Sequence, residues 1–281
     1  MASVESPQQT RKERRELARE QRRALERAQE DMRARRKRLR QLASVLGVVV
    51  VGIVVVVIAS SSGGVKTIAP RSAGARQAAN AVTTLLAGIP QQGNALGAPT
   101  APVTLQYFGD LECPVCRSFT QSALPALVGR WVRPGAVRIE YRSLQTATRE
   151  PEVFESQQLA ALAAGRQGKL WNFVETFYAE QLQEGSGYVT PRFIDGIAEQ
   201  VPGLSSGAWS AARGDPRLAE QLNVDAQAAN AQGLDGTPAF LIGRTGGAMS
   251  RLEPSSFTEA GAFDGAIEKL AGGARAARTG G

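Results

Sequence analysis

The only two cysteines of the chain, Cys113 and Cys116, lie three residues apart in a Cys-Pro-Val-Cys segment. A pair at this spacing directly after a strand pattern is typical of a redox site. Apolar residues indicate a strand at 103–108, and residues 117–124 indicate a helix with Pro114 in its first turn. Unpaired N–H groups at a helix start stabilise a thiolate. The pattern therefore predicts Cys113 as an exposed nucleophile and Cys116, one turn further, as the resolving thiol.

Two other uses of the cysteine pair are less favoured. A zinc site usually takes four ligands, commonly cysteine and histidine, and this chain has no histidine and no third cysteine. A structural disulfide that closes so short a loop would constrain the unfolded chain little. We therefore expect redox chemistry without a metal or cofactor. The lack of histidine also argues against Ser-His-Asp, Cys-His and His-Glu-x-x-His catalysis.

The positive charge of the chain belongs to its first 40 residues. These carry 14 Lys/Arg and 7 Asp/Glu, which gives the whole net charge of +7 and leaves the remainder neutral. The run at 1–40 is predicted to be a basic cytoplasmic tail, a solvated helix with opposite charges at i,i+4 spacing. Binding of its basic residues to anionic lipid headgroups is the alternative, and nucleic-acid binding is the least favoured.

Residues 41–60 are predicted to form a transmembrane anchor. From Leu42 to Ser60 polar groups are nearly absent, and about 19 residues at about 1.5 Å each span about 28 Å, close to a bilayer core. Six basic residues lie between positions 33 and 40, so the positive-inside rule places the tail in the cytoplasm and residues after Ser61 outside. The long tail favours an uncleaved signal anchor, with cleavage near Ala59 still open.

The outer part alternates strand and helix patterns after a stalk and short helix at 61–87. Disulfides form and persist in the oxidising environment expected there. A flexible tail is expected at 274–281. The predicted elements are a helix at 76–87, an edge strand at 89–94, strands at 103–108 and 136–141, a helical block at 155–233, strands at 238–243 and 249–252, and a helix at 257–270 that ends at the glycines near 272.

This order and three motifs resemble the DsbA-like branch of the thioredoxin superfamily. The motifs are the strand and redox segment at 103–116, Gln167–Phe173, and Gly236–Phe240. The likeness covers about residues 88–272. It implies an α/β thioredoxin-like fold at 88–273 with an inserted helical domain at about 150–233, preceded by the single transmembrane helix.

The resemblance also implies roles for particular residues. Cys113 and Cys116 would exchange disulfides through a mixed-disulfide intermediate, supported by Pro114 and Val115. Thr237 and Pro238 would lie beside the sulfurs, with the proline in the cis form. Without the resemblance, Thr237 and Pro238 could simply begin an edge strand.

The expected function is that of a membrane-tethered thiol–disulfide oxidoreductase that forms disulfides in reduced, exported proteins. The family suggests a quinone-linked membrane partner that reoxidises the site. Disulfide reduction or isomerisation is the alternative chemistry. A tethered chaperone or binding module, in which the cysteines are incidental, is the alternative outside catalysis.

The chain departs from its relatives at two positions. Val115 stands where strongly oxidising relatives often carry histidine, so we expect a less oxidising couple. Tyr107 stands where several relatives have an acidic residue. Asp110 and Glu112 are close in sequence, and a fixed negative charge beside the sulfur would raise the pKa of the thiol.

The basic tail and the apolar segment after it predict how the chain is oriented in the membrane. In intact cells, a protease that cannot cross the membrane should degrade the part after Ser61 and leave an epitope at the N-terminus protected, because the basic flank fixes the orientation. Immunoblotting of both ends measures the outcome. Protection of the C-terminal part instead would overturn the predicted export of the redox site.

Overall fold

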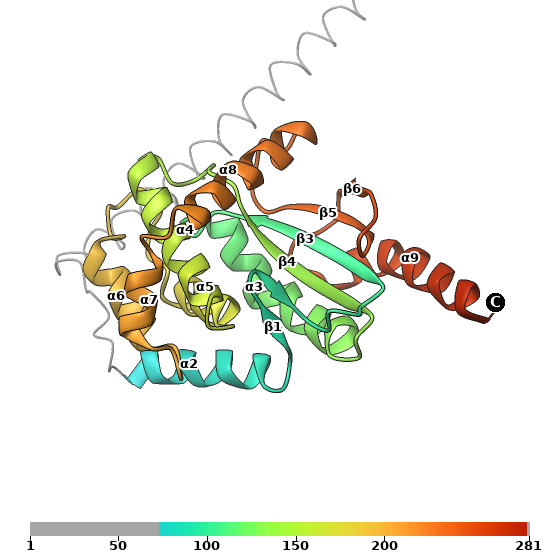
Figure 1. Cartoon of the computed structure of the whole chain (residues 1–281), viewed down its shortest axis with the longest axis horizontal. Helices are drawn as coiled ribbons and strands as arrows, with labels where there is room; N and C mark the ends of the chain where they lie inside the picture. Colours follow the sequence, from blue (N-terminus) through green and yellow to red (C-terminus); the bar gives the residue numbers. More distant parts are fainter. Residues whose placement is uncertain (1–72, 280–281) are drawn as a thin grey trace, which may run out of the picture. The chain divides into compact units, whose positions relative to one another are not determined.

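The computed structural model describes residues 73–279 (Figure 1). The predicted tail at 1–40, the anchor at 41–60 and the stalk up to residue 72 lie outside this range. Between residues 73 and 279, no helix is both long and apolar enough to cross a membrane.

A mixed sheet forms the centre of the described part, with strand order β1-β2-β4-β3-β5-β6. Strands β3 and β4 are parallel, and every other neighbouring pair is antiparallel. The strands are β1 Gln91–Gln92, β2 Ala95–Leu96, β3 Val103–Gly109, β4 Val137–Ser143, β5 Ala239–Arg244 and β6 Met249–Leu252.

Strand β3 lies in the middle of the sheet and is buried along its whole length. Its two buried polar side chains have partners: the hydroxyl of Thr104 lies 2.9 Å from that of Thr245, and the amide of Gln106 donates to Glu140 at 3.1 Å. Strand β4, in contrast, alternates buried and half-buried residues. Successive side chains of β3 serve opposite faces: Tyr107 packs in the large core, and Phe108 packs in a smaller core with Ala229 and Leu241.

Helices cover both faces of the sheet. The large core is closed by α3 (Pro114–Leu127), which continues as a π-helical turn at Val128–Val132, and by α9 (Gly261–Thr279). The ring of Phe119 on α3 lies 4.9 Å from the rings of both Tyr107 and Phe240, and Phe263 of α9 joins the same cluster. The smaller core is covered by α8 (Pro216–Ala231).

The helical insertion lies between β4 and β5. Its helices are α4 (Pro151–Gly165), α5 (Leu170–Glu180), α6 (Pro191–Glu199), α7 (Ser206–Ala212) and α8. Helix α5 is its buried centre, against which the preceding α2 (Ala73–Leu86) also packs. The indole N–H of Trp171 donates to the carbonyl of Asn94 at 3.0 Å. The predicted motif at 167–173 therefore attaches the insertion to the turn between β1 and β2.

Two predicted elements need correction. The expected edge strand at 89–94 is only the short β1, and the chain turns at once into β2. A strand of two residues is too short to show an alternating pattern, so β2 could not be predicted from the sequence. The last helix begins at Gly261 instead of 257 and continues past Gly272 to Thr279. A glycine within a helix costs only about 1 kcal/mol relative to alanine, and the alanine- and arginine-rich residues that follow favour helix.

Glu175 makes the stability of this fold depend on pH. Its side chain is buried in α5, one carboxylate oxygen has no hydrogen-bond partner, and burial raises its pKa to about 8. An unfolded glutamate has an ordinary pKa near 4.5. The folded state therefore holds a proton that the unfolded chain releases, so stability should fall as pH rises from about 4.5 to about 8.

We predict that Glu175→Gln, which keeps the shape and removes the charge, flattens this dependence. The variant should melt at a higher temperature than the parent at pH 8 and close to the parent at pH 4.5, because only the charged carboxylate is costly to bury. Thermal unfolding at both pH values measures the effect, with Glu199→Gln on α6 as a control. A pH dependence that Glu175→Gln leaves unaltered would contradict this origin.

Candidate redox site

The two cysteines lie where β3 passes into α3. The N–H of Cys113 donates to the carbonyl of Asp110 at 3.0 Å and closes a turn after the strand. Cys113 is the N-cap of α3, with Pro114 as the first helical residue. The backbone N–H of Cys116 donates to Sγ of Cys113 at 3.3 Å. The sulfur thus occupies the place of a capping oxygen and receives one of the N–H groups left unpaired at a helix start.

The two thiols are free and differ in burial. Cys116 is fully buried, whereas Val115 between them is 43% exposed. Cys113 was expected to be exposed, but only 4% of its surface is accessible. The reason is the loop at Thr237: the Cys113 thiol donates to the carbonyl of Thr237 at 3.3 Å. Cys113 is therefore the more accessible sulfur at the edge of a largely covered site.

The Thr237–Pro238 loop reaches the cysteines because of the strand order. Strand β5 begins at Ala239, which pairs with Phe108 near the end of β3. The residues just before β5 therefore lie beside the residues just after β3. The Thr237–Pro238 bond is cis, the isomer that the resemblance implied. β5 lies between β3 and β6, so the alternative that these two residues begin an edge strand is wrong.

The surroundings of the two thiols lower the pKa of Cys113 and raise the pKa of Cys116. The hydrogen bond with the Cys116 thiol is the largest cause that lowers the pKa of Cys113 to about 6, against the opposing effect of burial. The Thr237 side chain and the N–H groups of Val115 and Cys116 lower it further. Burial, above all, raises the pKa of Cys116 well above its ordinary value. Near neutral pH, Cys113 is the thiolate and Cys116 the thiol.

Asp110 binds a neighbouring loop, and its carboxylate is not among the largest influences on the Cys113 thiol. The sequence had predicted that the negative charge would raise the pKa of that thiol. The carboxylate is instead fully buried and satisfied by donors of its own. These donors are the N–H groups of Glu112, Thr146, Ala147 and Thr148, at 2.9–3.1 Å, and the hydroxyl of Thr148 at 2.5 Å.

Sequence reasoning missed the loop at 145–148 and Gln181. The loop follows β4, and the carboxyl ends of the parallel strands β3 and β4 meet at one edge of the sheet. The parallel pairing of β3 and β4 could have indicated this contact, because it places the loop after β4 beside Asp110, which follows β3. Gln181 follows α5, and its amide donates to the carbonyls of Leu111 and Cys113 at 2.8 and 3.1 Å. The helical insertion thus holds the redox segment directly.

Tyr107, which replaces an acidic residue of several relatives, is fully buried under the site. Its hydroxyl donates to that of Tyr178 at 3.0 Å, which donates to the carbonyl of Asp110 at 3.0 Å. Burial is the main cause that raises the pKa of Tyr107 well above its ordinary value. Tyr107 is therefore neutral and supplies no negative charge beneath Cys116.

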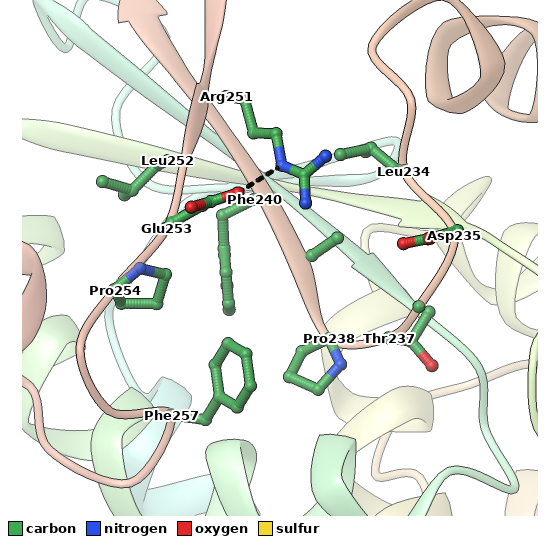
Figure 2. A pocket seen from close by; sticks show the side chains of 12 residues that line it. Leu234, Asp235, Thr237, Pro238, Phe240, Arg251, Leu252, Glu253, Pro254 and Phe257 are labelled. Atoms are coloured by element: carbon green, nitrogen blue, oxygen red, sulfur yellow. Dashed lines mark ion pairs between the residues drawn. The ribbon is translucent and has the colours of Figure 1, made fainter.

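A pocket of about 340 Å³ lies beside the cis-proline loop (Figure 2). Its apolar lining includes Pro238, Phe240 and Phe257, and the two phenylalanine rings lie 6.2 Å apart. An ion pair between Arg251 and Glu253, with Nε and Oε1 3.0 Å apart, forms its polar part. Among residues 73–279, no group of acidic, cysteine or histidine residues is arranged to hold a metal ion.

A family model described as Thioredoxin matches residues 91–253, more than half of the chain. The chain belongs to the thioredoxin family. With a Cys-x-x-Cys pair at the start of a helix and a cis-proline beside it, this thioredoxin-family protein is a thiol–disulfide oxidoreductase.

Three known proteins illustrate the relationship. The probable disulfide bond formation protein D of Bacillus anthracis is 24% identical over 154 residues, which are 52% of this chain and 68% of that protein. The Na(+)/H(+) antiporter NhaA 1 of Salinispora arenicola is 28% identical over 177 residues, 63% of this chain but only 26% of the antiporter. The crystal structure of oxidised BdbD from Bacillus subtilis shares the fold, with a TM-score of 0.54, 19% identity, and coverage of 66% of this chain and 97% of that one.

The acidity difference predicts a pH profile for alkylation of the reduced, full-length protein. The iodoacetamide rate at Cys113 should rise with pH to a half-maximal value near pH 6, because the thiolate is the nucleophile and its pKa is about 6. Cys116 should remain unmodified until the protein unfolds. Mass spectrometry of the labelled cysteines measures both rates. A midpoint between pH 8 and 9, the range of an ordinary thiol, would contradict the described environment.

Proposed function

We propose that this oxidoreductase forms disulfides in exported proteins, using Cys113 as the residue that bonds to the client. The observation that carries the proposal is the asymmetry of the pair. Cys113 has the lowered pKa and is the less buried of the two cysteines, and its thiol contacts the carbonyl of Thr237 beside the cis-proline. Cys116 is buried with a raised pKa, as suits a thiol that reacts only within the protein.

The reaction is two successive exchanges. A client thiolate attacks Sγ of Cys113 in the oxidised protein, the client–Cys113 bond forms, and Cys116 leaves as a thiolate that takes up a proton. A second client thiolate then attacks the client sulfur of the mixed disulfide, and Cys113 leaves as a thiolate. The client loses two electrons and two thiol protons, and the pair Cys113–Cys116 gains the electrons.

The acidity of Cys113 supports oxidation over reduction. A stable thiolate at Cys113 favours the reduced form of the pair and makes it a better leaving group, so the oxidised form gives up its disulfide readily. Each unit by which the pKa falls is worth about 1.4 kcal/mol, or about 30 mV for a two-electron couple. Val115 has no charge with which to stabilise the Cys113 thiolate. The reduction potential of the pair therefore depends on the helix start, Cys116 and Thr237, which lower the pKa of Cys113.

The site is proposed to work outside the cytoplasm. The support is the sequence at 1–60, where a basic tail precedes an apolar segment. A quinone-linked membrane protein is proposed to reoxidise Cys113 and Cys116 after each cycle, because the exchange leaves them reduced. The unfolded client is proposed to place an apolar side chain in the pocket beside Pro238, whose phenylalanine-lined wall fits such a group.

Trapping variants test the proposal in cells. In full-length Cys116→Ser, Cys113 can still exchange with client disulfides, and mixed disulfides between Cys113 and exported proteins should accumulate because Cys116 is no longer present to attack Sγ of Cys113 and release the client. Cys113→Ser should trap few or none, since Cys116 is fully buried. Non-reducing electrophoresis followed by mass spectrometry identifies the trapped proteins.

The double variant Cys113→Ser, Cys116→Ser is the matched control. Equal trapping by both single variants would show that Cys113 is not the specific residue that bonds to the client. If clients bind the double variant and cells that carry it show no redox defect, the protein is a tethered binding module and not an oxidase of exported proteins. A native pair that is mostly reduced in intact cells, measured by alkylation, would favour reduction or isomerisation instead.

A further inference from the structure

A second cavity adjoins the redox site and shares no lining residue with the pocket beside Pro238. Its volume is about 630 Å³, and it lies between the start of α3 and the segment that follows α5. We call it the α3–α5 groove. Its lining includes Pro114, Arg117 and Gln121 of α3 and Gln181, Leu182 and Glu184 after α5.

Cys113 lies between the two cavities. Its thiol donates to the carbonyl of Thr237, which lines the pocket beside Pro238. The next residue, Pro114, lines the α3–α5 groove, and the carbonyl of Cys113 accepts from the side-chain amide of Gln181 in the wall of the groove at 3.1 Å. An extended chain that is joined to Cys113 through its own cysteine therefore has one cavity within reach of its residues on each side.

Arg117 gives the groove a positive charge that has no acidic partner. Its backbone N–H donates to the carbonyl of Cys113 at 3.1 Å, so Arg117 lies one helical turn after the redox residue. Arg117 is half-buried, and Nη1 donates to the carbonyl of Gln181 at 3.2 Å, which uses one of the five N–H donors of a guanidinium. Within residues 73–279, no carboxylate forms an ion pair with Arg117.

The acidic residues around the groove leave this charge available to a ligand. Glu184 is exposed, so water and salt screen its charge more than that of the half-buried Arg117. Glu112, which precedes Cys113, is buried, and burial is the main cause that raises its pKa. The carboxylate of Asp110 is occupied by donors from its own loop and from the loop at 145–148. A partly covered guanidinium, planar and rich in donors, matches a carboxylate best.

We propose that the α3–α5 groove is a second client subsite and that it binds an acidic side chain, an aspartate or glutamate near the client cysteine, through Arg117. The apolar client residue on the other side of that cysteine enters the pocket beside Pro238. The inference deepens the proposed function and rests on it, because the client must be bonded to Cys113. The two cavities together select cysteines that have an apolar neighbour on one side and an acidic neighbour on the other.

Reduced peptides with defined flanking residues test this preference. One series contains Leu-Gly-Cys-Gly-Glu and the other the reverse order, Glu-Gly-Cys-Gly-Leu, each followed by a Gly-Ser linker and a second cysteine. Matched peptides carry Gln in place of Glu. Because Glu also raises the pKa of the cysteine in the free peptide, each rate is divided by the rate of the same peptide with oxidised glutathione.

The oxidised, full-length protein should oxidise the Glu peptide about fivefold faster than the Gln peptide in at least one series at low ionic strength. The series that shows the preference gives the direction of the client chain. The preference should decrease as salt is added, because the contact is between charges. Quenching with acid followed by mass spectrometry measures the rates.

Three variants assign the preference to Arg117. Arg117→Gln should abolish it, and Arg117→Lys, which keeps the charge and loses the planar fork, should retain about a twofold preference. Arg244→Gln is the matched control, because Arg244 is exposed and pairs with Val103 at the end of β3 opposite the redox site. It should keep the fivefold preference. Each value is a ratio of two peptides on one protein, so a change in the acidity of Cys113 cancels.

Equal rates for the Glu and Gln peptides in both series, or a preference that persists in Arg117→Gln, overturn the inference. Faster oxidation of peptides with Lys in place of Glu also overturns it, because Glu184 would then set the charge of the groove. The trapping experiment fails independently. Clients trapped without acidic residues near the bonded cysteine would leave the proposed function standing and refute the subsite. Absence of trapped clients with the peptide preference intact would refute the function and leave the subsite standing.

Discussion

The hydrogen bond from the Cys116 N–H to the Cys113 sulfur links folding and chemistry in this protein. Helix α3 needs an acceptor at its first turn, and the thiolate needs donors, so one contact serves both. The contact exists only because β3 ends at Gly109 and the chain turns at Asp110. The central strand therefore determines where the reactive sulfur stands, and the rest of the fold is arranged around that point.

Burial and hydrogen bonding compete at this sulfur. Burial disfavours any thiolate, and it dominates at Cys116, whose pKa is raised. At Cys113 the surrounding donors outweigh burial, and the pKa falls to about 6. The pKa values of two cysteines one helical turn apart are thus shifted in opposite directions by their surroundings. The cis-proline loop contributes through Thr237, which is among the groups that lower the pKa of Cys113.

The sequence predicted the secondary structure correctly where that structure depends on a local pattern of residues. The strand at 103–108, the helix after Cys113 and the helical block all follow from apolar spacing and turn residues. The link between Thr237 and Cys113 came only from family resemblance, because strand order is not a local property. The role of Asp110 could not be predicted from the sequence, because three of the four N–H groups that its carboxylate accepts come from a loop after another strand. The burial of Cys113 was missed for the same reason, since the covering loop is 124 residues away.

The complete burial of Cys116 has a consequence for oxidative damage. Peroxide reacts with exposed thiolates and converts them stepwise to sulfenic, sulfinic and sulfonic acids, the last two of which are not readily reversed. In this protein the oxidant meets Cys113 first, and the sulfenic acid formed there lies next to a protected thiol. Cys116 can condense with it, release water and give the ordinary disulfide. The buried partner therefore returns a damaged site to its working oxidised state before the irreversible steps begin.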